Sequence, residues 1–425
     1  MRACEDGVLF YPVYALLFAD AGLSTAQIST LFVIWSVVSF VFEVPSGAWA
    51  DAWSRRRLYA LGAFLTAAGF ASWTFWPTYA GFALGFLLWG LGGALSSGTL
   101  EALLYDQLGD SAAYARVAGR GGTVAILAML AATVLASPAF TLGGYLLVGV
   151  FSVAVPAAGG LLALGFHEGP AEVTGPGDGK EPPRTPSAVT PVDVASIMSV
   201  AADVELFHEA HRSADGHTPD KPRSAGESQE TGGAQERGYL GTLRAGVGEA
   251  VGSRRVAWAV LVAALVPGFT ALDEYLPLLS RSAGAPTAVV PLMYALPALA
   301  MAGGSALAGR WSAITAPRLA AALATAAVLL AGGALSGRLA GMVPIALAFG
   351  ILQFAIIVTE TRLQESITGP ARATVLSVAG FASEVFAVLL YAVFGAGAGF
   401  ASVSTLFAWC ALPLLATALA AGRRH

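Results

Sequence analysis

The chain has 425 residues, of which 56% are apolar and only 12% carry a charge. Soluble globular proteins carry about 25% charged residues, so this composition excludes that class and indicates a chain that folds in a lipid bilayer. The formal net charge of −4 leaves no basic surface for nucleic acid. The two cysteines, Cys4 and Cys410, are too few for a disulfide framework or a metal cluster, and we expect no metal and no cofactor.

Twelve apolar stretches, called spans 1 to 12 below, are long enough to cross a hydrocarbon core of about 30 Å as helices. They cover residues 7–23, 26–50, 58–77, 79–105, 118–139, 142–166, 256–279, 287–309, 317–337, 340–363, 372–396 and 399–421. The sequence therefore predicts an all-α membrane protein with twelve transmembrane helices. A cleavable signal peptide in place of span 1 is disfavoured, because Glu5 and Asp6 give its leading segment the wrong charge.

The basic residues are distributed unevenly between the loops. If the N-terminus lies in the cytoplasm, only Arg281 and Arg338 of the 23 lysines and arginines fall on the outer side. This agrees with the positive-inside bias of membrane proteins. We therefore expect a multi-pass protein of the cell membrane with both termini in the cytoplasm.

The chain divides into three parts. Residues 1–166 and 256–425 each hold six spans and are predicted to form two six-helix bundles. Residues 167–255 are rich in Pro, Gly, Ser and acidic residues, which predicts a largely disordered cytoplasmic linker. Within it, Val192 to His211 has the apolar spacing of a short amphipathic helix. His208 in that segment, with His211, is interpreted as part of a solvated helix end and not as a metal ligand, because no further ligand is placed beside them.

The two bundles show weak internal similarity. The segment Tyr14–Asp20 matches Tyr275–Arg281 in register, and Glu101–Asp106 has the same acid spacing as Glu360–Glu365. Similarity six spans apart is typical of parallel repeats in transporters. The sequence thus predicts two pseudo-symmetric bundles.

A short charged turn follows span 2. Residues 47–57 read GAWADAWSRRR, and this turn resembles the signature loop between helices 2 and 3 of the major facilitator superfamily of transporters. That signature is Gly-x-x-x-Asp-(Arg/Lys)-x-Gly-(Arg/Lys)-(Arg/Lys), and Ala52 and Ser54 depart from it. The chain is thereby similar to the twelve-helix members of this superfamily. In the second half, Gly304 to Arg310 stands at the matching place, but Ala308 replaces the aspartate.

The resemblance implies an inner gate. Asp51 would cap the N-terminus of span 11, and Arg55 or Arg56 would pair with Asp106 at the inner end of span 4. The alternative is that the arginines only set topology, which is the interpretation we prefer for Arg57. The residues implied as a gating motif are Gly47, Asp51, Arg55, Arg56 and Asp106.

Six other carboxylates lie within apolar spans, where each would cost about 3 kcal/mol at the centre of a lipid-facing helix. They are candidates for proton coupling or substrate contact, with structural pairing to nearby arginines as the alternative. In the superfamily the cavity is lined mainly by helices 1, 4, 7 and 10, and four of the six sit on spans 4, 7 and 10. The six are Glu43, Glu101, Asp273, Glu274, Glu360 and Glu384.

Asp20 and Arg281 occupy matched places at the outer ends of spans 1 and 7. In this superfamily those two ends approach each other when the cavity opens inward, so the two charges could meet as an outer latch. The alternative is two unpaired charges beside polar loops. Aromatic residues such as Tyr11, Trp35 and Trp89 could stack on a flat substrate, but packing is the interpretation that the sequence favours.

No nucleotide-binding loop or catalytic constellation is found, so we expect no enzyme and no catalytic residue. The sequence predicts a monomeric secondary active transporter that moves a small organic solute by alternating access, with proton-coupled export as the first choice. Its partners would be the solute, protons and the bilayer. Gly119 to Thr123 lacks the proline that drug–proton antiporters often carry in span 5. Uptake of a metabolite or anion is the second candidate, and a non-transporting receptor or scaffold is the third.

Overall fold

The structure is a computed structural model. It describes residues 1–100, 103–104, 111–165, 254–311, 314–367 and 372–422. The linker over 167–255, with its predicted amphipathic helix and His208 and His211, lies almost wholly outside the described residues. Every regular element in the described part of the chain is a helix, as the apolar spans predict.

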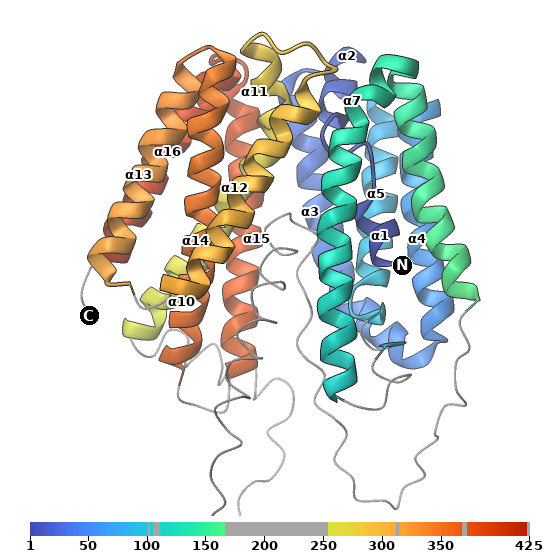
Figure 1. The fold of residues 1–425 in the computed structure, drawn as a ribbon, viewed down its shortest axis with the longest axis horizontal. Coiled ribbons are helices and arrows are strands. Elements are labelled where there is room, and N and C mark those ends of the chain that lie inside the picture. Colours follow the sequence, from blue (N-terminus) through green and yellow to red (C-terminus); the bar gives the residue numbers. More distant parts are fainter. Residues whose placement is uncertain (101–102, 105–110, 166–253, 312–313, 368–371, 423–425) are drawn as a thin grey trace, which may run out of the picture.

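The N-terminal bundle holds spans 1 to 6 (Figure 1). Its elements are α1 (Arg2–Asp6), α2 (Tyr14–Asp20), α3 (Thr25–Ala52), α4 (Arg55–Phe75), α5 (Tyr79–Ser96) and α7 (Ser111–Leu164). The C-terminal bundle holds spans 7 to 12. Its elements are α10 (Arg254–Gly268), η1 (Phe269–Tyr275), α11 (Leu276–Ser282), α12 (Val290–Trp311), α13 (Ala316–Leu335), η2 (Leu339–Gly341), α14 (Met342–Ser366), α15 (Arg372–Gly397) and α16 (Val403–Gly422).

Ten of the described helical segments are long and apolar enough to cross a membrane. The long helix α7 contains two spans, because its backbone leaves helical geometry at Gly143 and at Gly144, where φ is +59°. Span 1 is the other departure, since within residues 7–23 only Tyr14–Asp20 form a helix, α2, and the short helix α1 precedes the predicted span. The all-α membrane fold is confirmed, but in place of the expected continuous helix over residues 7–23 the chain forms turns over residues 9–13 and then the short helix α2.

Helix starts follow the local sequence. The Ser24 hydroxyl caps α3 by accepting a hydrogen bond from the Gln27 backbone N–H, and the Ser24 backbone N–H donates to the side-chain oxygen of Gln27, which completes a capping box. The hydroxyls of Ser54 and Thr78 cap α4 and α5 in the same way. These caps let consecutive spans reverse direction within a few residues.

Glycine permits close contact between helices within each bundle. A Cβ on Gly62 of α4 would lie 2.6 Å from the Gly92 carbonyl oxygen of α5, and a Cβ on Gly350 of α14 would lie 2.7 Å from the Ala300 carbonyl oxygen of α12. Both distances are too short for any side chain. Small residues allow such approach in membranes, where helix association depends on packing rather than on expulsion of water.

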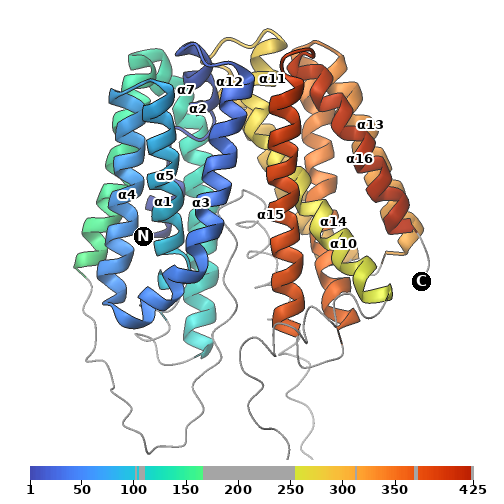
Figure 2. The ribbon, with the colours of Figure 1, turned by 180° about the vertical axis from the view of Figure 1, so that it is seen from behind.

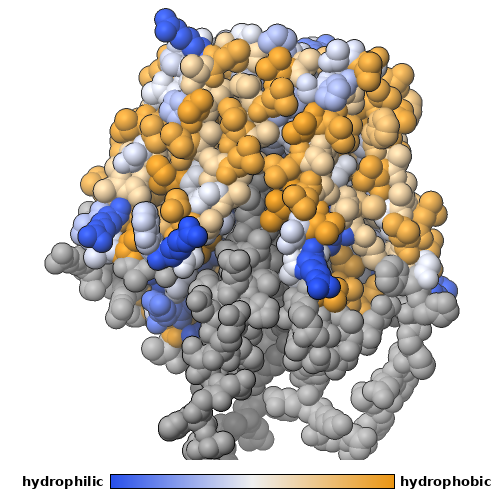
Figure 3. Space-filling model, in the orientation of Figure 1, coloured by the Kyte–Doolittle hydropathy of each residue, from blue (hydrophilic) through white to orange (hydrophobic). Residues whose placement is uncertain are grey.

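The outside of the molecule is apolar. On the face shown in Figure 3, hydrophobic residues cover most of the described surface between two more polar ends. Exposed leucines and phenylalanines lie on α7, α15 and α16 and in the loop before α16, and the most exposed are Leu142, Phe400 and Leu419. This surface is suited to lipid and would be unstable in water.

The two bundles meet through matched pairs of helices. Helix α3 packs against α15, α7 against α12, and α2 against α11. In both views the bundles converge at the end where α2 and α11 lie and diverge toward the other end (Figures 1 and 2). We call the first of these the α2/α11 end.

Candidate functional site

Spans 1 and 7 are both broken, and at matching places. Between α1 and α2 the chain forms turns over residues 9–13, while span 7 changes to the 3-10 segment η1 between α10 and α11. The register that pairs Tyr14 with Tyr275 places residues 9–13 opposite residues 270–274. Discontinuous helices at matched positions of two repeats are the structural mark of a transporter binding site.

The backbone groups freed by the break in span 1 find partners inside the bundle. The Phe10 N–H donates to the Ser152 hydroxyl of α7 at 3.0 Å, and Ser152 is wholly buried. The Phe10 carbonyl accepts from the N–H groups of Val13 and Tyr14, both at 2.8 Å. Irregular backbone at membrane depth is tolerated only with such internal partners. The break is therefore a built feature of the fold.

A third break interrupts span 4. Helix α5 ends at Ser96, and Gly98 has φ of +69°, in the left-handed region that side chains other than glycine rarely adopt. Ser96, Ser97 and Gly98 line a cavity within the N-terminal bundle. The break thus brings hydroxyl groups and open backbone to the wall of an otherwise apolar space.

This cavity encloses about 1050 Å³ of space free of atoms, part of it continuous with solvent. Two helix stripes form much of its wall, each spaced at four residues so that its members share one face. The stripe on α3 is Trp35, Ser39 and Glu43; the stripe on and after α5 is Trp89, Gly93 and Ser97. Further lining residues come from α1, α4 and α7, so every one of them belongs to the N-terminal bundle.

Aromatic rings stack along the cavity. Trp89 lies 5.7 Å from Tyr11 and 5.1 Å from Trp35 between ring centroids, and both pairs are within 24° of parallel. Among the described residues no other ring contacts Trp35. Trp35 therefore ends the aromatic stack, and part of its partly buried indole borders the cavity.

The charges at the cavity are two acids and one base among the described lining residues. Arg2 Nη1 lies 3.1 Å from Glu5 Oε2. The Glu43 carboxylate, by contrast, makes no hydrogen bond or ion pair to any described residue. Glu43 is thus a half-buried carboxylate that faces open space and is not neutralised by a described base.

The acids at the break of span 7 lie at the boundary between the bundles. Asp273 and Glu274 belong to η1, and electrostatic interactions connect them, with Glu384 of α15, to Tyr391. Glu274 also interacts with Tyr11 of the N-terminal bundle. Its carboxylate makes no hydrogen bond or ion pair to the described residues. These three carboxylates bring titratable charge to the side of the C-terminal bundle that faces the cavity-bearing half.

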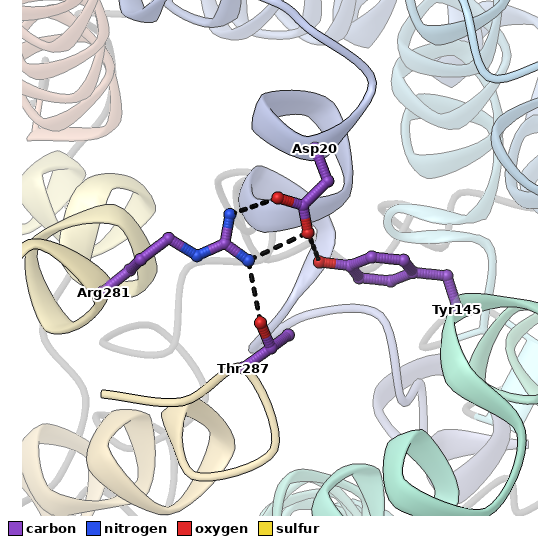
Figure 4. Close-up of polar contacts among 4 residues, drawn as sticks. All are labelled: Asp20, Tyr145, Arg281 and Thr287. Carbon is purple, nitrogen blue, oxygen red and sulfur yellow. Dashed lines mark hydrogen bonds and ion pairs between the residues drawn. The ribbon is translucent and has the colours of Figure 1, made fainter. Parts of the chain in front are cut away.

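At the α2/α11 end, Asp20 and Arg281 form a two-armed ion pair between the bundles (Figure 4). Arg281 Nη1 lies 2.5 Å from Asp20 Oδ1, and Nη2 lies 2.9 Å from Oδ2. Tyr145, at the turn within α7, donates to Asp20 Oδ2 at 2.6 Å, and Arg281 Nη2 also donates to the Thr287 hydroxyl at 2.9 Å. The sequence brought Asp20 and Arg281 forward but gave no signal for Tyr145.

A second polar contact joins the bundles nearby. The hydroxyls of Ser29 on α3 and Tyr275 lie 2.7 Å apart, both buried. Tyr275 is stacked on Phe394 of α15 at 3.8 Å, and Phe32 of α3 packs edge-on against it at 5.3 Å. A Cβ on Gly395 would lie 2.8 Å from Ser29 Cβ, so α3 and α15 are in close contact here.

The signature turn is shorter than its sequence suggests. Helix α3 continues through Gly47 and Asp51 to Ala52, and α4 begins at Arg55, so only Trp53 and Ser54 lie between helices. Ser54, one of the departures from the signature, accepts a hydrogen bond from the Arg57 N–H and caps α4. Arg55 and Arg56 form the first turn of α4. The side chain of Asp51 and the whole of Asp106 lie outside the described residues, so the inner gate stays a prediction.

The remaining predicted carboxylates do not gather at the cavity. Glu360 is exposed on α14, and Glu101 lies outside the described residues. Near Glu360, Arg362 donates from its guanidinium to the Ile314 carbonyl, in the turn between α12 and α13. That turn is the second-half counterpart of the signature turn, and here a backbone carbonyl holds the arginine.

Comparison with known proteins decides the family. The sequence matches the Major Facilitator Superfamily over residues 6–390. The chain belongs to this superfamily. It is therefore a multi-pass membrane transporter and not an enzyme, and the twelve-helix assignment is confirmed. A search among curated proteins finds no match.

Solved structures of superfamily-like transporters share the fold. An auto-inhibited peptide transporter of the POT family aligns with a TM-score of 0.61 at 17% identity, covering 99% of this chain and 94% of that chain. The nucleoside transporter NupG aligns with 0.62 at 12% identity, covering 99% and 95%. A bacterial homologue of the iron transporter ferroportin, in an inward-facing state, aligns with 0.60 at 13% identity, covering 100% and 96%. At these identities the likeness establishes the fold alone.

Proposed function

We propose that this transporter is a proton-coupled exporter of small organic solutes in the cell membrane, working by alternating access. The observation that carries the proposal is the pair of matched breaks in spans 1 and 7, with an unneutralised carboxylate close to each, Glu43 on the N-terminal side and Glu274 in η1. Broken spans place open backbone and polar side chains at the bundle boundary, where a solute can be held between two rocking halves.

In this proposal the α2/α11 end faces outward. The Asp20–Arg281 ion pair and the Ser29–Tyr275 contact hold the outer side shut, and the diverging end faces the cytoplasm. The arrangement then represents a state loaded from inside. The positive-inside distribution of arginines supports this orientation, because Arg281 lies at the α2/α11 end and Arg55, Arg56 and Arg57 at the opposite end.

Coupling to protons is assigned to Glu274. A carboxylate without a base in a membrane protein can exchange a proton as its surroundings alternate between protein and water. Its charge acts on Tyr11 of the other bundle, so its electrostatic environment changes when the bundles move. Anion uptake has less support, because the described base of the cavity, Arg2, is paired with Glu5.

The test uses everted membrane vesicles that contain the full chain. A proton gradient is generated, and ligands found by thermal shift on the purified protein are added, since a ligand that prefers the folded state raises the melting temperature. An exported solute accumulates in the vesicles and discharges the gradient, reported by an acridine dye. Accumulation only in right-side-out vesicles would establish uptake in its place, and no movement of any ligand in either kind would favour a receptor or scaffold.

A further inference from the structure

We propose that the cavity inside the N-terminal bundle is the recognition site for a cation that carries a flat aromatic ring, with the ring on Trp35 and the charge at Glu43. The proposal rests on the transport function proposed above and names the substrate class. The juxtaposition that carries it is an indole at the end of an aromatic stack and an unneutralised carboxylate on one stripe of α3, both lining one cavity.

The aromatic part of the site is already assembled. Tyr11, Trp89 and Trp35 form a continuous stack, and Trp35 ends it among the described residues. A ring added on the open side of Trp35 would extend a stack whose geometry is fixed by its neighbours. An offset stack between aromatic rings contributes about 0.5–1.5 kcal/mol beyond the area buried.

The charge preference follows from the lining residues. Arg2 and Glu5 neutralise each other, which leaves Glu43 as the unbalanced charge of the described wall. A cation is therefore favoured over a neutral molecule, and an anion is disfavoured. The π-face of an indole also attracts cations, so the two features select the same sign of charge.

The spacing on α3 defines the shape of the ligand. Trp35 and Glu43 are eight residues apart, which is about 12 Å of helix rise. Ser39 lies between them on the same face and is nearly buried. A ligand that uses both ends thus carries its charge on an arm that extends away from the ring, and a charge placed directly on the ring reaches only one of them.

The cavity also offers a position for blocking it. Gly93 of the α5 stripe lines the cavity, and a Cβ placed there meets no atom within 4 Å. The Cβ of a phenylalanine at this position fits without a clash, and the ring would occupy volume that a ligand needs. Gly332 of α13 is equally unobstructed and does not line the cavity, so Gly332→Phe is the matched control.

The experiment measures equilibrium binding of tritiated 4-(2-naphthyl)butyl-trimethylammonium to the full chain in lipid nanodiscs. Competitors are its neutral isostere, in which a carbon replaces the quaternary nitrogen, the corresponding naphthyl carboxylate, and the ammonium with a one-carbon arm. We expect the long-armed cation to bind about tenfold tighter than the neutral isostere and the short-armed cation. Equal binding of cation and isostere, or tighter binding of the carboxylate, would overturn the proposal.

Variants locate the binding. Glu43→Gln is expected to remove the preference for the cation, Glu43→Asp to retain most of it, and Glu365→Gln, at an exposed acid of α14, to leave it unchanged. Trp35→Leu weakens cation and isostere alike, whereas Trp409→Leu on the exposed face of α16 weakens neither. Gly93→Phe abolishes binding and Gly332→Phe does not. Retention of full affinity in both Glu43→Gln and Gly93→Phe would refute the site, provided that melting temperatures show folded protein.

A second measurement reports the location without altering the aromatic wall. Cys4 lines the same cavity, so in Cys410→Ser protein the bound cation should slow its labelling by N-ethylmaleimide about tenfold or more at saturation. Unchanged labelling would contradict the location. The transport proposal and the cation proposal can fail separately. Export of another class of solute by the vesicles would support the transport function and contradict the cation as substrate. Binding of the cation without transport of any solute would support the site and contradict the transport function.

Discussion

The N-terminal and C-terminal bundles share a topology but differ in what fills the centre of each. In the N-terminal bundle the break in span 1 leaves a cavity beside Trp35 and Trp89. In the C-terminal bundle the break in span 7 is closed by Phe269, Tyr275 and Phe394, which are buried. Under the function and substrate class proposed above, this difference corresponds to a division of roles, in which the N-terminal bundle recognises the solute and the C-terminal bundle supplies the coupling carboxylate.

The strongest test of this division changes the two acids separately. Glu274→Gln is expected to lower gradient-driven transport by about 100-fold or more while solute exchange continues, because exchange needs no proton to be loaded and released. Glu43→Gln should weaken both driven transport and exchange through lower affinity. Everted vesicles with and without a proton gradient measure both. If gradient-driven transport by Glu274→Gln is as fast as that by the parent, Glu274 is not the coupling acid.

The signature turn is kept in the first half only, which gives the next largest effect. Asp51→Asn should slow transport about tenfold and shift the population toward the inward-open state, because the cap that Asp51 is predicted to provide for span 11 would be lost. Insertion and melting temperature should be unchanged. Arg57→Gln, at the exposed arginine beside the turn, serves as the control and should transport at the parent's rate. Equal rates for Asp51→Asn and the parent would remove the inner gate.

The close contact of α3 with α15 predicts a structural effect. Gly395→Leu places a side chain where even a Cβ would lie 2.8 Å from Ser29 Cβ, and should therefore separate the bundles at the α2/α11 end. Spin labels at Phe75 and Leu335, both exposed, in protein with Cys4 and Cys410 changed to serine, should move apart. Gly332→Leu, with open space around it, should leave the label distance unchanged. An unchanged distance in Gly395→Leu would show that this contact does not limit opening.

The smallest effect belongs to the Asp20–Arg281 pair. A partly exposed ion pair contributes about 0.2–1 kcal/mol, so breaking it should shift the ratio of the two states by up to about fivefold. Asp20→Arg and Arg281→Asp should each increase the separation of the same spin labels, and the double swap should restore it. Single effects that simply add in the double variant would show that the pair is not a latch.

Hydropathy was sufficient to predict the fold. Each span has to form its backbone hydrogen bonds within one helix in lipid, so it is recognisable in the sequence as a long apolar stretch. The breaks were harder to predict. The sequence of residues 7–23 predicts one apolar helix. The turn at Phe10 depends on the Ser152 hydroxyl of α7, which is 142 residues away in the chain. The helix propensity of residues 7–23 carries no information about so distant a hydrogen-bonding partner.

The site was predicted unevenly for similar reasons. Asp20 and Arg281 could be paired through the repeat, which relates distant positions by symmetry, whereas Tyr145 reaches Asp20 only because α7 bends at Gly143 and Gly144. Trp35 and Glu43 were each noted in the sequence as candidates, but the four-residue spacing that joins them through Ser39 into one stripe was not recognised. Its aromatic member was interpreted as packing, because sequence alone does not distinguish a helix face against a neighbour from one beside a cavity.

The network in Figure 4 also bears on how fast the transporter can cycle. Arg281 contacts Thr287 within its own bundle, and Asp20 contacts Tyr145 within the other. When the bundles part, each charge keeps a hydrogen-bonding companion and neither is stranded, so the penalty for an orphaned polar group does not arise on the way to the open state. The Asp20–Arg281 ion pair therefore stabilises the shut state, and opening costs only the free energy of that ion pair, with no added penalty for unpaired polar groups.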